Sequence, residues 1–377
     1  MSLARAASGG AAVTNIEVFF DLVYAFSVTQ LSHHLLEHAS IEGALQTALL
    51  LAMVWLVWAS TTYLANWLDP DRLPVRVLFI AIMLVSLLMS AELPEAFGRG
   101  GASVGVAYAA MQIGRNLFAA IAMRDEPIAR TLQRVLVWVI ASGALAVFGG
   151  LEHGHVRELL WALAVALDLF GIAVGFYVPG LGRSTTRDWT FSGAHIAERS
   201  QAFVMIALGE SLVIIGASLA GLGVLSGGEI AAYVLAFAMT VSLWWVYFDR
   251  TAAEAARTIA AAPDPGRHTR SAYYWIHPVM IAGIIVVAAG DRFVLADPLG
   301  IASATTSLTV LGGSALFLAG HTLFKRALWR SWPWTRLVAI VALACLIPVG
   351  TRIPGVAVGG IAVMVFVVVV ILDRFGP

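Results

Sequence analysis

Long apolar runs, broken by short polar segments, set the pattern of this chain. About 20 apolar residues are enough for a helix to cross the hydrocarbon core of a bilayer. Twelve such runs can be drawn, at residues 15–37, 45–68, 75–97, 102–123, 131–150, 157–179, 195–219, 229–249, 271–290, 305–325, 334–351 and 355–373. Pro, Gly and charged residues interrupt them, as in "LDPDRLP". The pattern predicts an all-α polytopic membrane protein with about twelve transmembrane helices. The longest polar connection, "RTIAAAPDPGRHTR", is expected to be a loop.

Composition supports this membrane assignment. Of the 377 residues, 60% are hydrophobic and 12% charged, whereas soluble domains are about a quarter charged. The 23 basic and 23 acidic residues balance, so charge gives no reason to expect nucleic acid as a partner. Cys345 is the only cysteine, which excludes an internal disulfide and a cysteine-ligated metal site. No cofactor is expected; the expected partners are the lipid bilayer and a small molecule or ion, with a homo-oligomer left open.

The arginines and the lysine predict the orientation. If the N-terminus is cytoplasmic, 17 of the 23 basic residues fall in cytoplasmic segments and 4 in outer ones, with Arg115 and Arg199 inside spans. The positive-inside rule then places both termini in the cytoplasm. We expect a multi-pass protein of a bacterial cytoplasmic membrane.

The chain also resembles a duplication. "EVFFDLVYAFSVTQL" and "ERSQAFVMIALGESL" both open with Glu and keep a polar pair at the same offset. Six spans per unit is an even number, so residues 1–189 and 190–377 would form two parallel six-helix repeats about an axis normal to the membrane. Chance similarity between apolar helices is the alternative.

Topology places several polar side chains at one depth. Ions within a span are costly, about 2.5–3.5 kcal/mol for a central acid, and such residues face partners or cavities. In the predicted arrangement the cytoplasmic half of the bundle holds Glu17, Asp21, Arg115, His195, Glu198, Arg199, His277 and His321. Together with Gln30 and with Glu210 near mid-membrane, these are the candidate ligand- or ion-binding residues. Arg199 lies eleven residues before Glu210, about 16 Å along a helix, so the two cannot pair within it.

Each of these residues also has a structural interpretation. Glu17 and Asp21 are four residues apart and share a helix face, but acids near a helix N-terminus also favour its dipole. The arginines could simply neutralise carboxylates, and His195 could cap its helix. Asp168 lies within a span with no obvious partner. Outer-surface positions are the expectation for His33, His34 and Glu37.

A metal site is not expected. "HLLE" at His34 and "HIAE" at His195 each place His and Glu three residues apart, the spacing of a half-site in a helical bundle. The two motifs are predicted to lie at opposite membrane faces, so they cannot form one centre.

Aromatic residues gather in three of the predicted spans. Most suit interface belts and packing, but some could line a pocket for an apolar or cationic ligand. The candidates for such a pocket are Trp58, Tyr63, Trp244, Trp245 and Tyr274.

Two segments, "EVFFDLVYAFSVTQLSHHL" and "HIAERSQAFVMIALGESLVIIG", closely resemble the signature segments of the bacterial low temperature requirement A family, and "YYWIHP" fits as well. The resemblance covers essentially the whole chain and implies a polytopic bacterial membrane protein, but no reaction.

Two functional hypotheses follow from the buried polar residues. One is a transporter or channel that moves a small solute, cation or proton through a buried carboxylate-containing site. The other is an intramembrane enzyme in which a buried Asp or Glu acts as general acid on a lipid-soluble, isoprenoid-like substrate.

Overall fold

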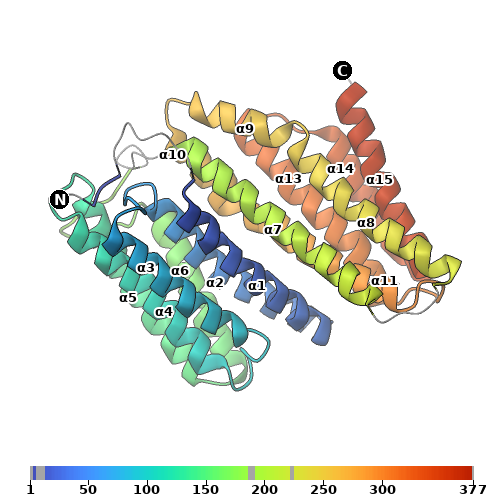
Figure 1. Ribbon diagram of the computed structural model, residues 1–377, viewed down its shortest axis with the longest axis horizontal. Coiled ribbons are helices and arrows are strands. Elements are labelled where there is room, and N and C mark those ends of the chain that lie inside the picture. The colour runs from blue at the N-terminus through green and yellow to red at the C-terminus, as the bar shows by residue number, and fades with distance from the viewer. Residues whose placement is uncertain (1–2, 6–12, 186–191, 221–224, 376–377) are drawn as a thin grey trace. The chain divides into compact units, whose positions relative to one another are not determined.

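The computed structural model describes residues 3–5, 13–185, 192–220 and 225–375. Every long secondary-structure element in this part of the chain is a helix (Figure 1). The helices are α1 (Asn15–Glu37), α2 (Ile41–Leu64), α3 (Leu73–Ala91), α4 (Gly101–Ala122), α5 (Ala129–Leu151), α6 (Gly154–Ala173), α7 (Gly193–Leu219), α8 (Gly227–Phe248), α9 (Thr251–Ala260), α10 (Pro265–Thr269), η2 (Arg270–Ile276), α11 (His277–Ala296), α12 (Ala304–Ser307), η3 (Leu308–Gly312), α13 (Gly313–Trp329), α14 (Trp334–Gly350) and α15 (Gly355–Phe375). The all-α prediction is confirmed.

Eight helical stretches of the described chain are long and apolar enough to cross a membrane. They are Ile41–Leu64, Leu73–Ala91, Ala129–Leu151, Gly193–Leu219, Gly227–Ala260, Pro265–Ala296, Ala304–Trp329 and Gly355–Arg374. The other four predicted spans coincide with α1, α4, α6 and α14, which are helical but shorter or more polar. A multi-pass membrane protein is therefore supported, while the number twelve stays a prediction.

The chain divides into two compact units. The first unit comprises Met1–His34, Glu42–Arg199 and Ala262–Arg267; the second comprises Leu35–Ile41, Ser200–Ala261 and His268–Pro377. The main division falls within α7, after Arg199. The predicted repeats, residues 1–189 and 190–377, remain a prediction.

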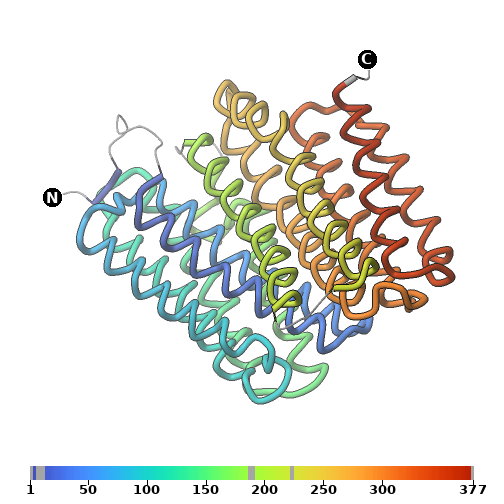
Figure 2. Tube along the Cα trace, turned by 45° about the vertical axis from the view of Figure 1, so that its right-hand side comes forward, coloured from blue at the N-terminus to red at the C-terminus, as the bar shows by residue number. Residues whose placement is uncertain are grey.

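In the first unit, α4, α5 and α6 follow one another side by side (Figure 2). Glycines bring α4 and α5 together: a Cβ on Gly105 would lie 2.3 Å from the Ala146 carbonyl oxygen, and one on Gly150 would lie 2.5 Å from the Gly101 oxygen. Small residues allow such backbone approach, which is a common basis of helix association in membranes.

Glycines also bring α11 and α13 of the second unit into close contact. A Cβ on Gly283 would lie 2.5 Å from the Phe317 nitrogen, and one on Gly320 would lie 2.9 Å from the Met280 nitrogen. Close packing of these two helices fixes the direction of the side chains between them, including His277 and His321.

The predicted polar loop after the eighth span was partly wrong. Its first four residues, 257–260, end helix α9, and residues 265–269 form α10. Helix α9 buries Ala252, Ala255 and Ile259 on one face, and these apolar contacts stabilise it. The Pro and Gly residues that follow led the sequence analysis to assign the whole segment to a loop. The π-helical turn η2 precedes Pro278, whose missing N–H removes one α-helical hydrogen bond.

Candidate functional site

The first unit holds a buried ionic cluster between the N-terminal turns of α1 and α7. Glu17 and Asp21 lie four residues apart on α1, and His195 and Arg199 lie four apart on α7. That spacing places each pair on one helix face, and the two faces meet. These four residues, with Arg5, are called the Arg199 cluster.

Arg199 connects the two carboxylates of the cluster. Its Nε donates to Asp21 Oδ2 at 2.7 Å and its Nη2 to Asp21 Oδ1 at 2.6 Å, a bidentate pair. Its Nη1 donates to Glu17 Oε1 at 3.2 Å. Trp58 Nε1 also donates to Asp21 Oδ1, at 2.7 Å. The Arg199 and Glu17 side chains are fully buried, so the guanidinium compensates charges that water cannot reach.

The two oxygens of Glu17 have different partners. Oε2 accepts from the backbone N–H and from Oγ1 of Thr14, both at 2.8 Å, and so caps the start of α1. Oε1 faces the cluster and lies 2.7 Å from His195 Nε2. The capping and the ionic interpretations of Glu17 therefore both hold, one for each oxygen.

The surroundings of His195 determine which ring nitrogen carries its proton. Asn66 Oδ1 accepts from the Ser192 backbone N–H at 3.0 Å, so the Asn66 amide nitrogen is the group that faces His195 Nδ1, at 3.1 Å. An amide nitrogen only donates, so Nδ1 accepts and the proton lies on Nε2. In this tautomer His195 Nε2–H donates to Glu17 Oε1, and Arg5 Nη1 lies 3.4 Å from the same nitrogen.

Arg5 is held in the cluster because the backbone around it pairs with the backbone after α2. Its N–H donates to the Trp67 carbonyl oxygen at 2.8 Å, and Asp69 N–H donates to the Leu3 oxygen at 2.9 Å. The Arg5 guanidinium then lies 3.6 Å from Glu17 Oε1. Two carboxylates thus face two guanidiniums, so the acidic and guanidinium charges of the Arg199 cluster balance.

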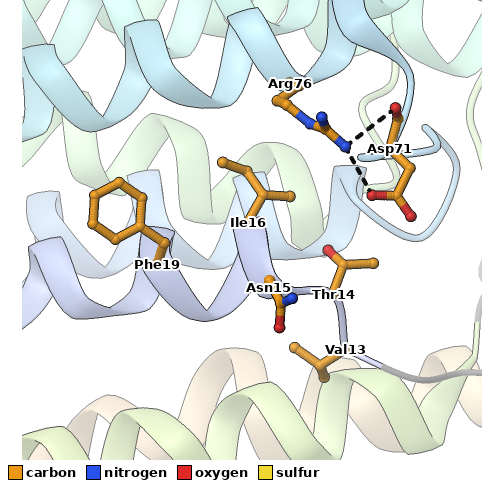
Figure 3. Close-up of a pocket in the computed structure, with 7 residues that line it drawn as sticks. All are labelled: Val13, Thr14, Asn15, Ile16, Phe19, Asp71 and Arg76. Atoms are coloured by element: carbon orange, nitrogen blue, oxygen red, sulfur yellow. Dashed lines mark hydrogen bonds and ion pairs between the residues drawn. The ribbon is translucent and has the colours of Figure 1, made fainter.

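A pocket opens beside the cluster at the start of α1 (Figure 3). It has a volume of about 540 Å³ and is lined by Val13, Thr14, Asn15, Ile16, Phe19, Asp71 and Arg76. Arg76 Nη2 donates to Asp71 Oδ1 at 3.1 Å on its wall. Thr14 joins pocket and cluster, because it lines the pocket and donates to Glu17.

Arg115, predicted to share the site, belongs to another buried network of the first unit. It donates to the Val57 carbonyl oxygen at 3.2 Å, to Thr61 Oγ1 at 3.0 Å, and to Gln112. Gln112 Nε2 donates to Asp168 Oδ2 at 3.0 Å, and Tyr108 donates to the same oxygen. Asp168, which had no obvious partner in the sequence, thus belongs to a network linking α2, α4 and α6.

His277 and His321 lie in the second unit. His277 Nε2 lies 2.8 Å from the Tyr247 hydroxyl. Arg336 Nε donates to His321 Nδ1 at 3.0 Å, and Arg336 also forms a bidentate pair with Asp373. Arg336, Asp373 and His321 are called the Arg336 cluster.

Sequence reasoning missed three members of these clusters, Arg5, Arg336 and Asp373, and also Asn66, which contacts His195. Arg336 was counted among the cytoplasmic loop residues although it fell inside the predicted span 334–351, and its side chain is 1% exposed. That position within an apolar run was the signal that it needs a partner. Arg5 and Asn66 gave no comparable signal, since non-local backbone contacts and loop geometry place them.

The other candidates are distributed over both units. Glu198 is exposed, and Gln30 is half-buried with no hydrogen bond to a described residue. Glu210 is buried in the part of α7 that belongs to the second unit.

The predicted aromatic residues have unlike surroundings. Trp58 donates to Asp21 in the first unit, where Tyr63 is also buried. In the second unit Tyr274 is buried and Trp244 is 39% exposed. Trp245 lines a pocket. His34, expected at the outer surface, is buried with its Nδ1 3.0 Å from Thr47 Oγ1.

One group among the described residues could hold a metal ion, although the sequence predicted none. Ligand atoms of Glu42, His155 and Glu158 all lie within 4.8 Å of one another. Glu42 and His155 are exposed. Glu158, 3.0 Å from His155 Nδ1, raises the pKa of that imidazole, which favours the protonated form over a metal ligand.

Comparison with known proteins agrees with the resemblance seen in the signature segments. A sequence model described as "Bacterial low temperature requirement A protein (LtrA)" matches residues 12–371. The chain is also 34% identical over 357 residues to "Uncharacterized protein RA0937" of Rhizobium meliloti (strain 1021), covering 93% of this chain and 87% of that relative. The chain is therefore a helical membrane protein that belongs to the bacterial low temperature requirement A family.

Proposed function

We propose that the protein is a transporter or channel-like protein and that the species handled by the Arg199 cluster is a proton. The observation that carries this proposal is the Glu17 carboxylate, fully buried with one oxygen toward His195 and Arg199 and the other toward Thr14 at a pocket wall. A buried carboxylate connected to an open pocket is a typical element of proton relays in membrane proteins.

Charge balance favours a proton over a metal cation. Arg199 occupies both oxygens of Asp21 and one of Glu17, and Arg5 lies near the same Glu17 oxygen. A metal ion would have to displace a guanidinium from these oxygens. A proton needs no such space, because it only converts a carboxylate oxygen into a hydroxyl.

Proton uptake would loosen the contact between α1 and α7. A protonated Glu17 no longer attracts Arg199, which then pairs with Asp21 alone. His195 can exchange a proton with Glu17 through Nε2. Passing it onward from Nδ1 requires Asn66 to turn its amide oxygen toward the ring, because the amide nitrogen that faces Nδ1 cannot accept a proton. Movement of a small solute or ion would be coupled to this exchange, because the same helix turn forms the pocket wall.

The test is proton flux into liposomes that contain the purified full-length protein and an internal pH-sensitive dye. A potassium gradient with valinomycin supplies the driving voltage. Wild type should acidify the lumen, and Asp21→Asn should lower the rate about tenfold or more, equivalent to about 1.4 kcal/mol or more in barrier height.

A matched control is Glu158→Gln, which removes an acid of the same unit that is not part of the cluster; its flux should equal wild type. Because Asp21→Asn removes a negative charge and leaves the positive charge of Arg199 partly uncompensated, the charge-balanced double variant Asp21→Asn/Arg199→Gln is measured too. Wild-type protein without flux, or full flux in a folded double variant, would overturn the proposal.

A further inference from the structure

The second unit has a pocket of about 180 Å³ at one end of its helices, separate from the residues of the proposed proton site. The end of α8, the first turn of α9, and residues of α13 and α15 line it. The side chains that carry the argument are Trp245, Asp249, Glu254, Lys325, Asp373 and Arg374.

Lys325 is the only lysine among the 23 basic residues of the sequence. Its ammonium makes no hydrogen bond or close ion pair with any residue that the structure describes. It lies 5.8 Å from the centroid of the Trp329 ring and interacts at longer range with the charges of Asp373 and Glu254. Lysine presents a compact charge with three rotatable donors, unlike the planar fork of arginine. Lys325 is half-buried and lines the pocket.

Trp245 supplies a second donor without a partner. Its indole Nε1 is buried and bonds to no acceptor in the described chain. Buried donors are nearly always satisfied, by protein, water or a ligand. The start of α9, at Thr251, adds a positive helix end to the same wall. Together these groups fit an oxyanion.

The acids of the pocket argue against a simple anion. Asp373 is already paired with Arg336, but Glu254 forms no ion pair in the described chain, and Asp249 lies 3.9 Å from an exposed Arg250. The pocket thus offers Lys325, Arg250 and Arg374 to an anionic group and Glu254 and Asp249 to a cationic one. A ligand that also carries an ammonium group would satisfy both signs.

We propose that this pocket binds a small zwitterion, with its phosphate or carboxylate at Lys325 and Trp245 Nε1 and its ammonium at Glu254 and Asp249. Phosphoethanolamine, as a lipid headgroup or as a free molecule, and free amino acids share this chemistry. The assignment does not depend on the proposed proton site, because it uses only residues of the second unit.

The single lysine makes a direct experiment possible. Reductive methylation with carbon-13 formaldehyde labels Lys325 and the chain's α-amino group and keeps the positive charge. In the purified full-length protein, the Lys325 resonance should shift saturably with phosphoethanolamine or with short-chain phosphatidylethanolamine. Glycerol phosphate and ethanolamine, which lack one charge each, should bind about tenfold or more weakly, as expected for loss of roughly 1.4 kcal/mol.

Variants connect the signal to the pocket. Calorimetry should show about tenfold weaker binding or worse for Lys325→Gln and Glu254→Gln. Arg326→Gln is the matched control, since it removes a neighbouring charge that lies over Trp332 and outside the pocket. Binding of the short-chain lipid alone would identify a headgroup site, and binding of the soluble zwitterions would identify a solute site. A Lys325 resonance that no ligand moves, or equal binding of glycerol phosphate, would overturn the assignment.

Discussion

Each unit buries an arginine that is bidentate to an aspartate and also contacts a second group, but the two clusters differ in charge and access. Arg199 bonds Asp21 and Glu17, and both acids are buried. Arg336 bonds Asp373, which is 29% exposed, and a neutral histidine acceptor. The first cluster holds two buried negative charges that both bond Arg199, whereas the second holds one acid that water can reach. Similar residue types thus form a site of strongly interacting buried charges in the first unit. In the second unit they form a site where water weakens the interaction between the charges.

The largest expected difference between the clusters concerns stability. Arg199→Gln leaves two buried carboxylates facing only Arg5 and His195, and should lower the free energy of unfolding by about 3–5 kcal/mol. Arg336→Gln leaves a partly solvated Asp373 and should cost about 1–3 kcal/mol. Unfolding of both variants in mixed detergent and SDS micelles, followed by circular dichroism, gives the two values.

Charge balance provides the control for that pair. Asp21→Asn/Arg199→Gln removes one charge of each sign and should recover part of the stability lost by Arg199→Gln. Recovery by the double variant would show that uncompensated charge, rather than lost packing of the long side chain, is the cause. Equal losses in Arg199→Gln and Arg336→Gln would remove the distinction between the clusters.

A smaller effect is expected at the histidines. In the second unit His321 Nδ1 accepts from Arg336, and Nε2 has no partner among the described residues. His321→Leu should therefore cost about 1–2 kcal/mol, the loss of one buried acceptor. His321→Asn should lose less, because its amide oxygen can take the place of Nδ1.

The matching change in the first unit should be larger. His195→Leu removes the Nε2–H donor to a fully buried carboxylate, and hydrogen bonds to charged groups contribute about 1.5–3 kcal/mol. Equilibrium unfolding of the three histidine variants under one condition tests this order. A cost at His321 above that at His195 would contradict it.

The two clusters also show how far sequence reasoning reached. The four-residue spacing of Glu17 and Asp21, together with the depth that these acids share with His195 and Arg199, anticipated side chains that meet across α1 and α7. That logic works where periodicity fixes a helix face. Arg115, expected at the same depth, donates to Gln112 and Thr61, because depth alone does not define which neighbouring helices touch.

Contacts that neither helix periodicity nor depth defines were beyond such reasoning. Arg336 and Asp373 are 37 residues apart, and Arg5 reaches Glu17 only because its backbone pairs with that of Trp67. The proton position on His195 depends on the orientation of Asn66, which Ser192 fixes. A pattern of apolar runs predicts helices well, but it contains no information about loop conformations of this kind.

The smallest predicted effect tests the connection between pocket and cluster. Thr14→Val keeps the backbone N–H bond to Glu17 Oε2 and removes only the Oγ1 donor, so stability should fall by about 0.5–1 kcal/mol. Thr240→Val is the matched control, because the hydroxyl of Thr240 bonds only the Ala236 carbonyl oxygen within its own helix. Proton flux should nevertheless decrease in Thr14→Val and not in Thr240→Val, since the lost hydroxyl is the polar group that joins the pocket wall to Glu17. Flux unchanged in both variants would show that protons reach Glu17 by a route that does not include this threonine, and the pocket would then lose its role in the proposed path.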